Sequence, residues 1–217
     1  MTLNVDLYWS FRSPYSYLAT PRLCRIARDC AVAIEVRIVL PLAVRKPDFF
    51  KQVNPLWPPY VLRDTMRLAE MLGLDYGWPD PDPIVQDFAT REVASEQPHI
   101  HRISRLGIEA NRLGHGLAFI DDVSRLIWSG KVRGWNTGDH LAHAAARAGL
   151  DLATMETRIA QDTGAYDALL AENQDALEKA GHWGVPTLSF NGEAFFGQDR
   201  IDVLLWRLKQ HGLERRG

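Results

Sequence analysis

Two β-rich segments lie near opposite ends of this chain of 217 residues, and a long stretch with helical patterning separates them. Near the N-terminus, residues 3–8 and 33–40 alternate apolar and polar side chains and predict two strands. Residues 14–29 between them predict a helix, with Ser13 at its N-cap and Pro14 at its first position. A strand, a helix and a strand in such close succession predict a right-handed βαβ unit.

The middle of the chain, from residue 59 to residue 180, has helical periodicity and no segment that predicts a strand. Helices are predicted near residues 61–71, 99–113, 118–129, 139–148, 152–161 and 165–180. The stretch GWPDPDP at residues 77–83 is rich in proline, so it predicts an irregular loop that crosses the surface or lines a cleft.

Strand patterning returns after this helical block. Residues 187–191 and 193–196 predict a hairpin that turns at Gly192, and residues 201–211 predict a final amphipathic helix. The two β-rich segments are therefore expected to complete one sheet. We predict an α/β fold in which residues 1–58 and 181–217 form a βαβ–ββα core and residues 59–180 form an all-helical insertion domain.

The composition limits the class of protein. Apolar residues make up 46% of the chain, which is enough for a sizeable core, and charged residues make up 24%. The net charge of -2 does not indicate a surface for nucleic acid or anionic membranes. No apolar run reaches the roughly 18 residues of a membrane span, and the start MTLNVDLYWS lacks signal-peptide features, so a cytoplasmic protein is expected.

The metal-binding and redox residue types are sparse. The two cysteines, Cys24 and Cys30, form neither a CxxC motif nor a metal pair, and we interpret them as small apolar residues. Disulfide exchange between protein cysteines is therefore not expected. His99 and His101 fall on different faces of a predicted helix without a nearby third ligand, so no metal site is expected.

Three short stretches carry a family resemblance. They are SPYSYLA at residues 13–19, GVPT at residues 184–187 and FFGQDR at residues 195–200. In this order, and with a βαβ–ββα core that contains inserted helices, they resemble the family of 2-hydroxychromene-2-carboxylate isomerases and kappa-class glutathione transferases. That family has the DsbA-like layout of the thioredoxin superfamily, and the resemblance covers nearly the whole chain.

The resemblance implies that glutathione supplies the reactive sulfur, with Ser13 and Ser16 standing where redox relatives carry cysteines. A serine hydroxyl cannot form a disulfide, but a hydrogen bond from it to a thiolate contributes roughly 1.5–3 kcal/mol. The N-terminus of a helix favours the same charge by roughly 0.3–1 kcal/mol, and by up to ~2 kcal/mol when partly buried. Together these effects can ionise a thiol with an ordinary pKa of about 8.5 near neutral pH. We expect Ser13 to be catalytic and Ser16 to support the helix.

The resemblance also implies further glutathione-binding residues. Pro186 is expected to be cis, which turns the backbone of Val185 toward the cysteinyl part of glutathione, where it can pair like an added strand. Gln198 and Asp199 are expected at the γ-glutamyl end, with Asp199 at the α-ammonium group. Asp199 could also cap the N-terminus of the final helix, and the two roles can hold at once.

One position departs from the family pattern. Asn54 resembles an asparagine that helps to hold glutathione, but Trp57 stands where the family usually carries a lysine. The cation for the glycine carboxylate is thereby lost, and Trp57 could instead wall the substrate pocket. The candidates to replace the cation are Arg45, Lys46 and Arg63.

Other residues are assigned to the substrate side. Arg12 places a positive charge where it can attract an acidic substrate or hold the thiolate. His182 precedes the proline loop and is a candidate acid or base, with packing in the loop as the alternative. Trp9, Phe11, Tyr15, Trp57 and Trp78 are candidates to line an aromatic cleft over the glutathione, and some of them are expected to belong to the core instead.

These observations predict a glutathione-dependent isomerase of the 2-hydroxychromene-2-carboxylate type. The thiolate is expected to add reversibly to an activated double bond of an aromatic-derived substrate. A kappa-type transferase or peroxidase that uses the same site is one alternative, and a non-catalytic thioredoxin-like binding module is another. The resemblance implies a homodimer, and neither nucleic acid nor a membrane is expected as a partner.

Overall fold

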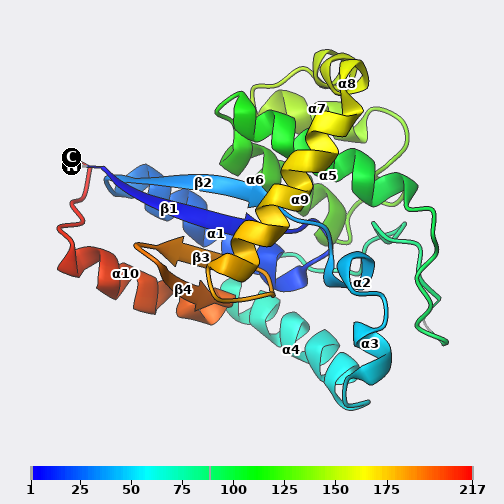
Figure 1. Cartoon of the computed structure of the whole chain (residues 1–217), viewed down its shortest axis with the longest axis horizontal. Helices are drawn as coiled ribbons and strands as arrows, with labels where there is room; N and C mark the ends of the chain where they lie inside the picture. The colour runs from blue at the N-terminus through cyan, green and yellow to red at the C-terminus, as the bar shows by residue number, and fades with distance from the viewer. Residues whose placement is uncertain (1, 88, 217) are drawn as a thin grey trace.

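The computed structural model describes residues 2–87 and 89–216, and its centre is a four-stranded sheet (Figure 1). The strands are β1 (Leu3–Trp9), β2 (Val32–Ile38), β3 (Thr187–Phe190) and β4 (Glu193–Phe196), in the order β2-β1-β3-β4. β1 pairs with β2 in parallel and with β3 in antiparallel fashion, and β3 pairs antiparallel with β4. The predicted βαβ–ββα core is confirmed.

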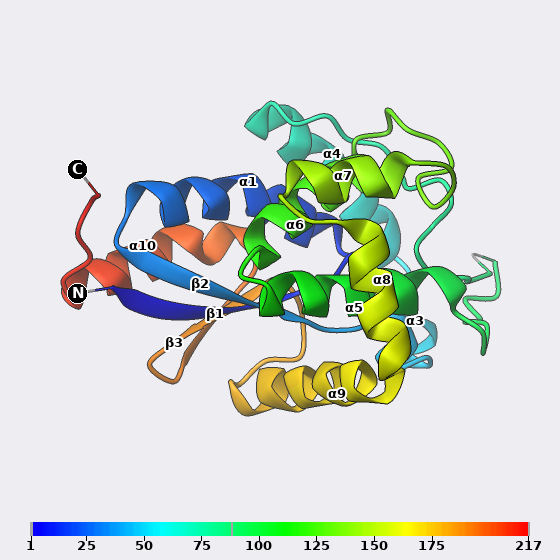
Figure 2. The same cartoon turned by 90° about the horizontal axis from the view of Figure 1, so that it is seen from above.

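Helices cover both faces of this sheet. Figure 2 shows α1 (Pro14–Asp29) and α10 (Ile201–Gln210) on one side of the strands and α9 (Thr163–Lys179) on the other. β1 alternates exposed and buried residues at its start and is buried continuously from Leu7 to Trp9. This change occurs because the carboxyl end of a central strand is covered from both faces.

The remaining long helices come between β2 and β3, in the stretch with helical patterning. They are α4 (Trp57–Leu72), α5 (Pro98–Arg112), α6 (Gly116–Trp128), α7 (His140–Arg147) and α8 (Leu152–Gln161). All were predicted within a few residues, and the largest error is at α4, which begins at Trp57 instead of residue 61. Pro58 and Pro59 can occupy its first turn, because the first N–H groups of a helix need no intrahelical acceptor.

Two single-turn helices, α2 (Leu42–Arg45) and α3 (Phe49–Gln52), were not predicted. Four residues are too few to display a helical period, so the sequence gives no pattern for them. They follow β2, which ends at Ile38 rather than at the predicted residue 40, and Figure 1 shows them near the start of α4. This segment borders the site described below.

The hairpin between β3 and β4 turns over two residues. Asn191 has a φ of 49° and Gly192 a φ of 81°. Two consecutive positive φ values are typical of the type I′ turn, whose twist matches that of the flanking strands. The prediction placed Asn191 in the strand and only Gly192 in the turn, so the strand is one residue shorter than expected.

The core fixes the segment that joins β1 to α1. Trp9 and Phe11 are completely buried, and the Trp9 indole N–H donates to Thr20 Oγ1 at 3.0 Å. The indole N–H of Trp128, on α6, donates to the carbonyl of Phe11 at 2.9 Å. Trp9 and Phe11 are therefore the members of the predicted aromatic set that belong to the core, and they do not line the cavity described below. Their burial instead fixes the backbone that presents Ser13.

Candidate active site

Ser13 caps the N-terminus of α1, as predicted. Its backbone is extended, with φ -112° and ψ 111°, and its Oγ accepts a hydrogen bond from the N–H of Ser16 at 3.2 Å. The same hydroxyl donates to the carbonyl of Val185 at 3.3 Å. Because one hydroxyl joins the first helix to the loop before β3, it lies where the two halves of the core meet.

The start of α1 can receive a negative charge. Among the residues described, none accepts a hydrogen bond from the N–H of Tyr15, the second residue of the helix. The macrodipole of a helix of 16 residues also favours an anion at this end. An anionic group beside the Ser13 hydroxyl would therefore meet a donor, a free N–H group and a favourable dipole.

The loop before β3 presents a strand-like edge to the same place. The peptide bond between Val185 and Pro186 is cis, as expected. Thr187 Oγ1 donates to the carbonyl of Gly184 at 2.7 Å, and the N–H of Gly197 donates to the carbonyl of Pro186 at 2.9 Å. No acceptor for the N–H of Val185 is found in the described part of the chain. The loop is thus fixed on both sides while one backbone donor stays available to a ligand.

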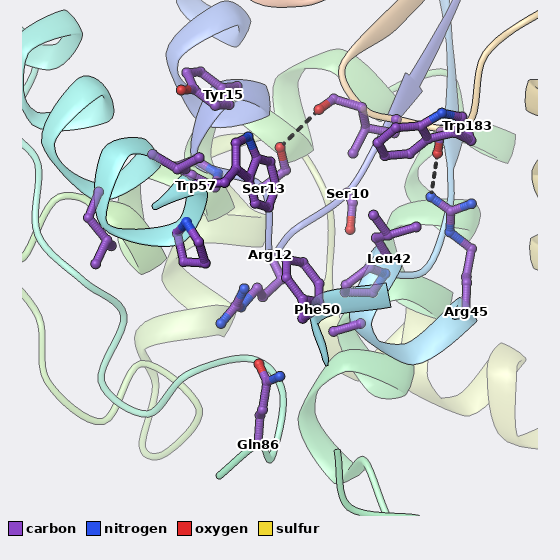
Figure 3. Close-up of a pocket in the computed structure, with 18 of the residues that line it drawn as sticks. Ser10, Arg12, Ser13, Tyr15, Leu42, Arg45, Phe50, Trp57, Gln86 and Trp183 are labelled. Carbon is purple, nitrogen blue, oxygen red and sulfur yellow. Dashed lines mark hydrogen bonds between the residues drawn. The ribbon is translucent and has the colours of Figure 1, made fainter. Parts of the chain in front are cut away.

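A cavity of about 550 Å³ opens beside Ser13. Figure 3 shows Ser13 at one side of it, with Trp57, Phe50 and Trp183 around it. Trp57 stacks on Phe50 with ring centroids 5.9 Å apart, and Phe49 packs against Trp183 at 5.1 Å. A largely apolar cavity of this volume is typical of a site for a small molecule.

Arginine side chains from three segments line the cavity. Arg12 forms a bidentate ion pair with Asp82, in which the Arg12 nitrogens lie 3.2 and 3.0 Å from the carboxylate oxygens. The Arg12 guanidinium lies 5.0 Å from the ring centroid of Trp78. Its charge is therefore already balanced. Arg45 donates to the main-chain carbonyls of Leu40 and Trp183 at 2.8 and 2.9 Å. Burial lowers the pKa of Arg45 below the usual arginine value. The third is Arg91.

Tyr15 and His182, both assigned to the substrate side from the sequence, make hydrogen bonds within the protein. The phenol of Tyr15 lines the cavity but donates to Asp64 at 2.8 Å, and burial raises its pKa well above the ordinary value. The Nδ1 atom of His182 accepts from the N–H of Gly184 at 2.9 Å, and its ring stacks on Phe196 at 3.8 Å. His182 is not among the lining residues, and burial lowers its pKa. The structure favours the packing role.

Three expected glutathione contacts lie outside the cavity lining. The side chain of Asn54 is exposed and accepts from the N–H of Leu56 at 3.0 Å. Gln198 is half-buried in the short helix η1 (Gln198–Arg200), and Asp199 is exposed and pairs with Arg200 at 2.9 Å. Asp199 makes no capping hydrogen bond to α10, so the predicted capping role is wrong.

Several lining residues were not assigned from the sequence. Among them are Leu42, Phe50, Gln86, Arg91, Trp183 and Phe196. Phe196 lies within the FFGQDR stretch and Trp183 directly follows His182, so the sequence motifs could have identified these two as site residues. Arg91 follows an irregular loop and matches no motif, so only the folded chain brings it to the site.

Within residues 2–87 and 89–216, no group of three or more His, Cys, Asp or Glu side chains could hold a metal ion. The same residues include no helix long and apolar enough to cross a membrane.

The sheet order, the cis-proline loop and the capped helix beside it define a thioredoxin-like α/β protein with a serine hydroxyl at its site. The chain belongs to the family of the DsbA-like thioredoxin domain, whose sequence model matches residues 4–209.

Individual proteins with similar sequences or structures are known. A 2-hydroxychromene-2-carboxylate isomerase from Pseudomonas sp. (strain C18) is 24% identical over 208 residues, or 92% of this chain and 87% of the relative. A solved 2-hydroxychromene-2-carboxylate isomerase superposes with a TM-score of 0.72 at 21% identity, covering 96% of this chain and 95% of the other. The cytosolic disulfide reductase DsbM from Pseudomonas aeruginosa, solved with GSH, gives 0.60 at 16% identity over 95% and 100% of the two chains.

Proposed function

We propose that this protein is a glutathione-dependent isomerase of the 2-hydroxychromene-2-carboxylate type. The observation that carries the proposal is the Ser13 hydroxyl, which lies between the start of α1 and Val185 and faces an apolar cavity. This is an anion site with no thiol of its own, since neither Cys24 nor Cys30 lines the cavity. A small thiol that binds there would supply the missing sulfur.

Glutathione suits this site because its thiolate and backbone match two features of the protein. The cysteinyl N–H and C=O can pair with the main chain of Val185, as a strand added to a sheet edge. The sulfur then lies beside Ser13, whose hydroxyl exchanges its 3.3 Å hydrogen bond to Val185 for one to the thiolate. We assign Asn54, Gln198 and Asp199, which are exposed or half-buried and lie outside the cavity lining, to the outer parts of glutathione.

The proposed reaction needs no protein nucleophile. The cyclic hemiketal form of the substrate first opens: its ring C–O bond breaks, the hydroxyl proton moves to the ring oxygen, and a phenol and a ketone conjugated to the double bond result. The thiolate then adds to this double bond, forming an S–C bond while the π electrons move onto the conjugated carbonyl. The former double bond is then single and rotates freely. Expulsion of the thiolate restores the double bond in the other geometry, so the atoms and electrons of glutathione are unchanged over the cycle.

The comparisons support this proposal in two ways. A relative that aligns with most of the chain is named as an isomerase of this type. A structural neighbour that shares the fold was solved with GSH. The homodimer and the cytoplasmic location stay predictions that rest on the family resemblance and on the composition.

The test follows the ultraviolet spectrum of 2-hydroxychromene-2-carboxylate mixed with purified protein. We expect isomerisation with glutathione, and none with S-methylglutathione, which has the same tripeptide but no free thiol. Turnover that is equal with both compounds, or absent with both, would contradict the proposal. Conjugation of a chloronitroarene or reduction of a hydroperoxide, without isomerisation, would indicate the transferase alternative instead.

A further inference from the structure

The charges around the cavity do not balance. Its lining includes Arg12, Arg45 and Arg91, whereas none of the described lining residues is an aspartate or a glutamate. The rest of the wall is mostly aromatic and aliphatic (Figure 3). A cavity with excess positive charge and little polar surface is suited to a ligand that is both apolar and anionic.

Only Arg12 has a carboxylate partner, because Asp82 pairs with it. Neither Arg45 nor Arg91 makes a salt bridge to any carboxylate in residues 2–87 and 89–216. Both are half-buried. A half-buried guanidinium that makes no salt bridge has lost part of its hydration without gaining a direct ionic contact, so an incoming carboxylate would bind it favourably.

Main-chain carbonyls hold these two arginines in place. Arg45, on α2, is fixed by Leu40 on one side and by Trp183 on the other, as the dashed line in Figure 3 shows for Trp183. Arg91 donates to the carbonyl of Phe50 at 2.7 Å. Because each uses only part of its five N–H donors on these contacts, the remaining N–H groups can bind a carboxylate. The anchoring also reduces the rotamer entropy lost on binding.

Of the three cations that the sequence offered for the glycine carboxylate of glutathione, Lys46 and Arg63 do not line the cavity. Lys46 pairs with Glu178 at 3.1 Å. Arg63 is exposed on α4 and does not line the cavity. Arg45 is thus the member of that set that reaches the cavity, and Arg91 is an addition that the sequence did not suggest.

We propose that Arg45 and Arg91 determine specificity by binding the carboxylate of an aromatic ligand whose ring packs against Trp57 and Phe50. This inference rests on the proposed function, because it concerns the substrate that would receive the glutathione thiolate. It requires the ligand to bear a negative charge as well as a ring.

The test measures binding by calorimetry without glutathione, using 2-naphthoate and its neutral counterpart 2-naphthamide. Naphthoate is expected to bind roughly tenfold more tightly than naphthamide, because a hydrogen bond to a charged group contributes about that factor to the affinity. Arg45→Met and Arg91→Met should each weaken naphthoate binding by roughly tenfold and change naphthamide binding by less than about twofold. Unchanged naphthamide binding shows that each variant keeps the cavity intact.

Two variants serve as controls. Arg63→Met removes an exposed guanidinium from α4 and should leave both affinities unchanged. Arg45→Lys keeps the positive charge but loses the planar guanidinium that can bind a carboxylate through two N–H groups. This variant should therefore retain part of the preference for naphthoate.

The proposal is overturned if naphthoate and naphthamide bind equally, if neither binds, or if the preference survives in both methionine variants. If one variant alone keeps the full preference, that arginine has no part in the site. None of these outcomes depends on glutathione, so they are separate from the isomerisation assay. Naphthoate selectivity without isomerisation would leave the anion site standing while the proposed reaction fails.

Discussion

The hydroxyl of Ser13 donates a hydrogen bond to the main-chain carbonyl of Val185, which lies 172 residues further along the chain, at 3.3 Å. This contact joins the start of the first helix to the cis-proline loop before β3. Both elements belong to the sheet core, and the helical block between them in sequence does not separate them in space. The location of the site therefore follows from the closure of one sheet by distant segments.

Replacing Ser13 by alanine should reduce glutathione-dependent kcat/KM by roughly tenfold to hundredfold, because the thiolate loses a hydrogen-bond donor. The variant also loses the N-cap, at a cost of about 1 kcal/mol in the free energy of unfolding. The pKa of bound glutathione, followed by thiolate absorbance near 240 nm, should rise.

Ser13→Asp separates the two roles of Ser13. An aspartate keeps the cap but cannot donate to the Val185 carbonyl, and its charge repels the thiolate, so the activity should fall as it does in Ser13→Ala. An alanine variant with unchanged rate and unchanged thiol ionisation would remove Ser13 from the mechanism.

A protein lacking both cysteines should remain active. Burial raises the pKa of the Cys24 thiol to about 12, and Cys30 caps the far end of α1 from Ser13. The Cys24→Ala, Cys30→Ala double variant is therefore expected to keep glutathione-dependent activity within about twofold, because a protonated thiol is a poor nucleophile. Loss of activity with an unchanged circular dichroism spectrum would show that a protein thiol takes part.

The Arg12–Asp82 pair should contribute to stability rather than serve only to attract ligands. The two side chains are 13% and 12% exposed, so removal of one charge leaves the other nearly buried. Arg12→Met should lower the free energy of unfolding by about 3 kcal/mol, as measured with urea. In Arg12→Met, Asp82→Asn the loss should be smaller, because no unpaired charge remains. A cost below ~1 kcal/mol for the single variant would contradict this prediction.

The protein should lose stability as the pH falls below neutral. Burial lowers the pKa of His182, and likewise of His101, below the ordinary value of 6.5. The unfolded chain therefore binds protons before the folded protein does. The stabilisation is complete above the unfolded pKa and is lost as the pH falls through the folded pKa.

Urea midpoints between pH 8 and pH 5 test this dependence. His182→Asn keeps an acceptor for the N–H of Gly184 but cannot titrate, so its midpoint should fall less steeply with acid. A parent protein that gains stability on acidification, or a variant with an identical profile, would show that His182 does not contribute.

Much of the fold could be predicted from local patterns. The period of two in β1 and β2 and the Ser-Pro start of α1 are local signals, and all three elements lie within two residues of their predicted bounds. Such signals work because capping and alternation depend on near neighbours in the chain. The segment from α2 to α3 gave no such signal, since each of its helices is a single turn.

Some features of the candidate site could likewise be predicted from local sequence, and others depended on the fold. Ser13, Val185 and Pro186 could be named from motifs, because their residue types are tied to a capped helix and a cis-proline loop. The burial of Trp9 could not be read from its sequence neighbours, since it depends on which face of β1 the helices cover.

The sequence by itself determined the strand and helix order, the lack of a cysteine pair and the place of a serine at the head of the first helix. Only the tertiary structure decided that Arg12 is neutralised by Asp82 while Arg45 and Arg91 line the cavity without a carboxylate partner among the described residues. The physical reason is that the effect of a charge depends on its neighbours and its hydration. Both are set by segments that lie far apart in the chain and meet only when it folds.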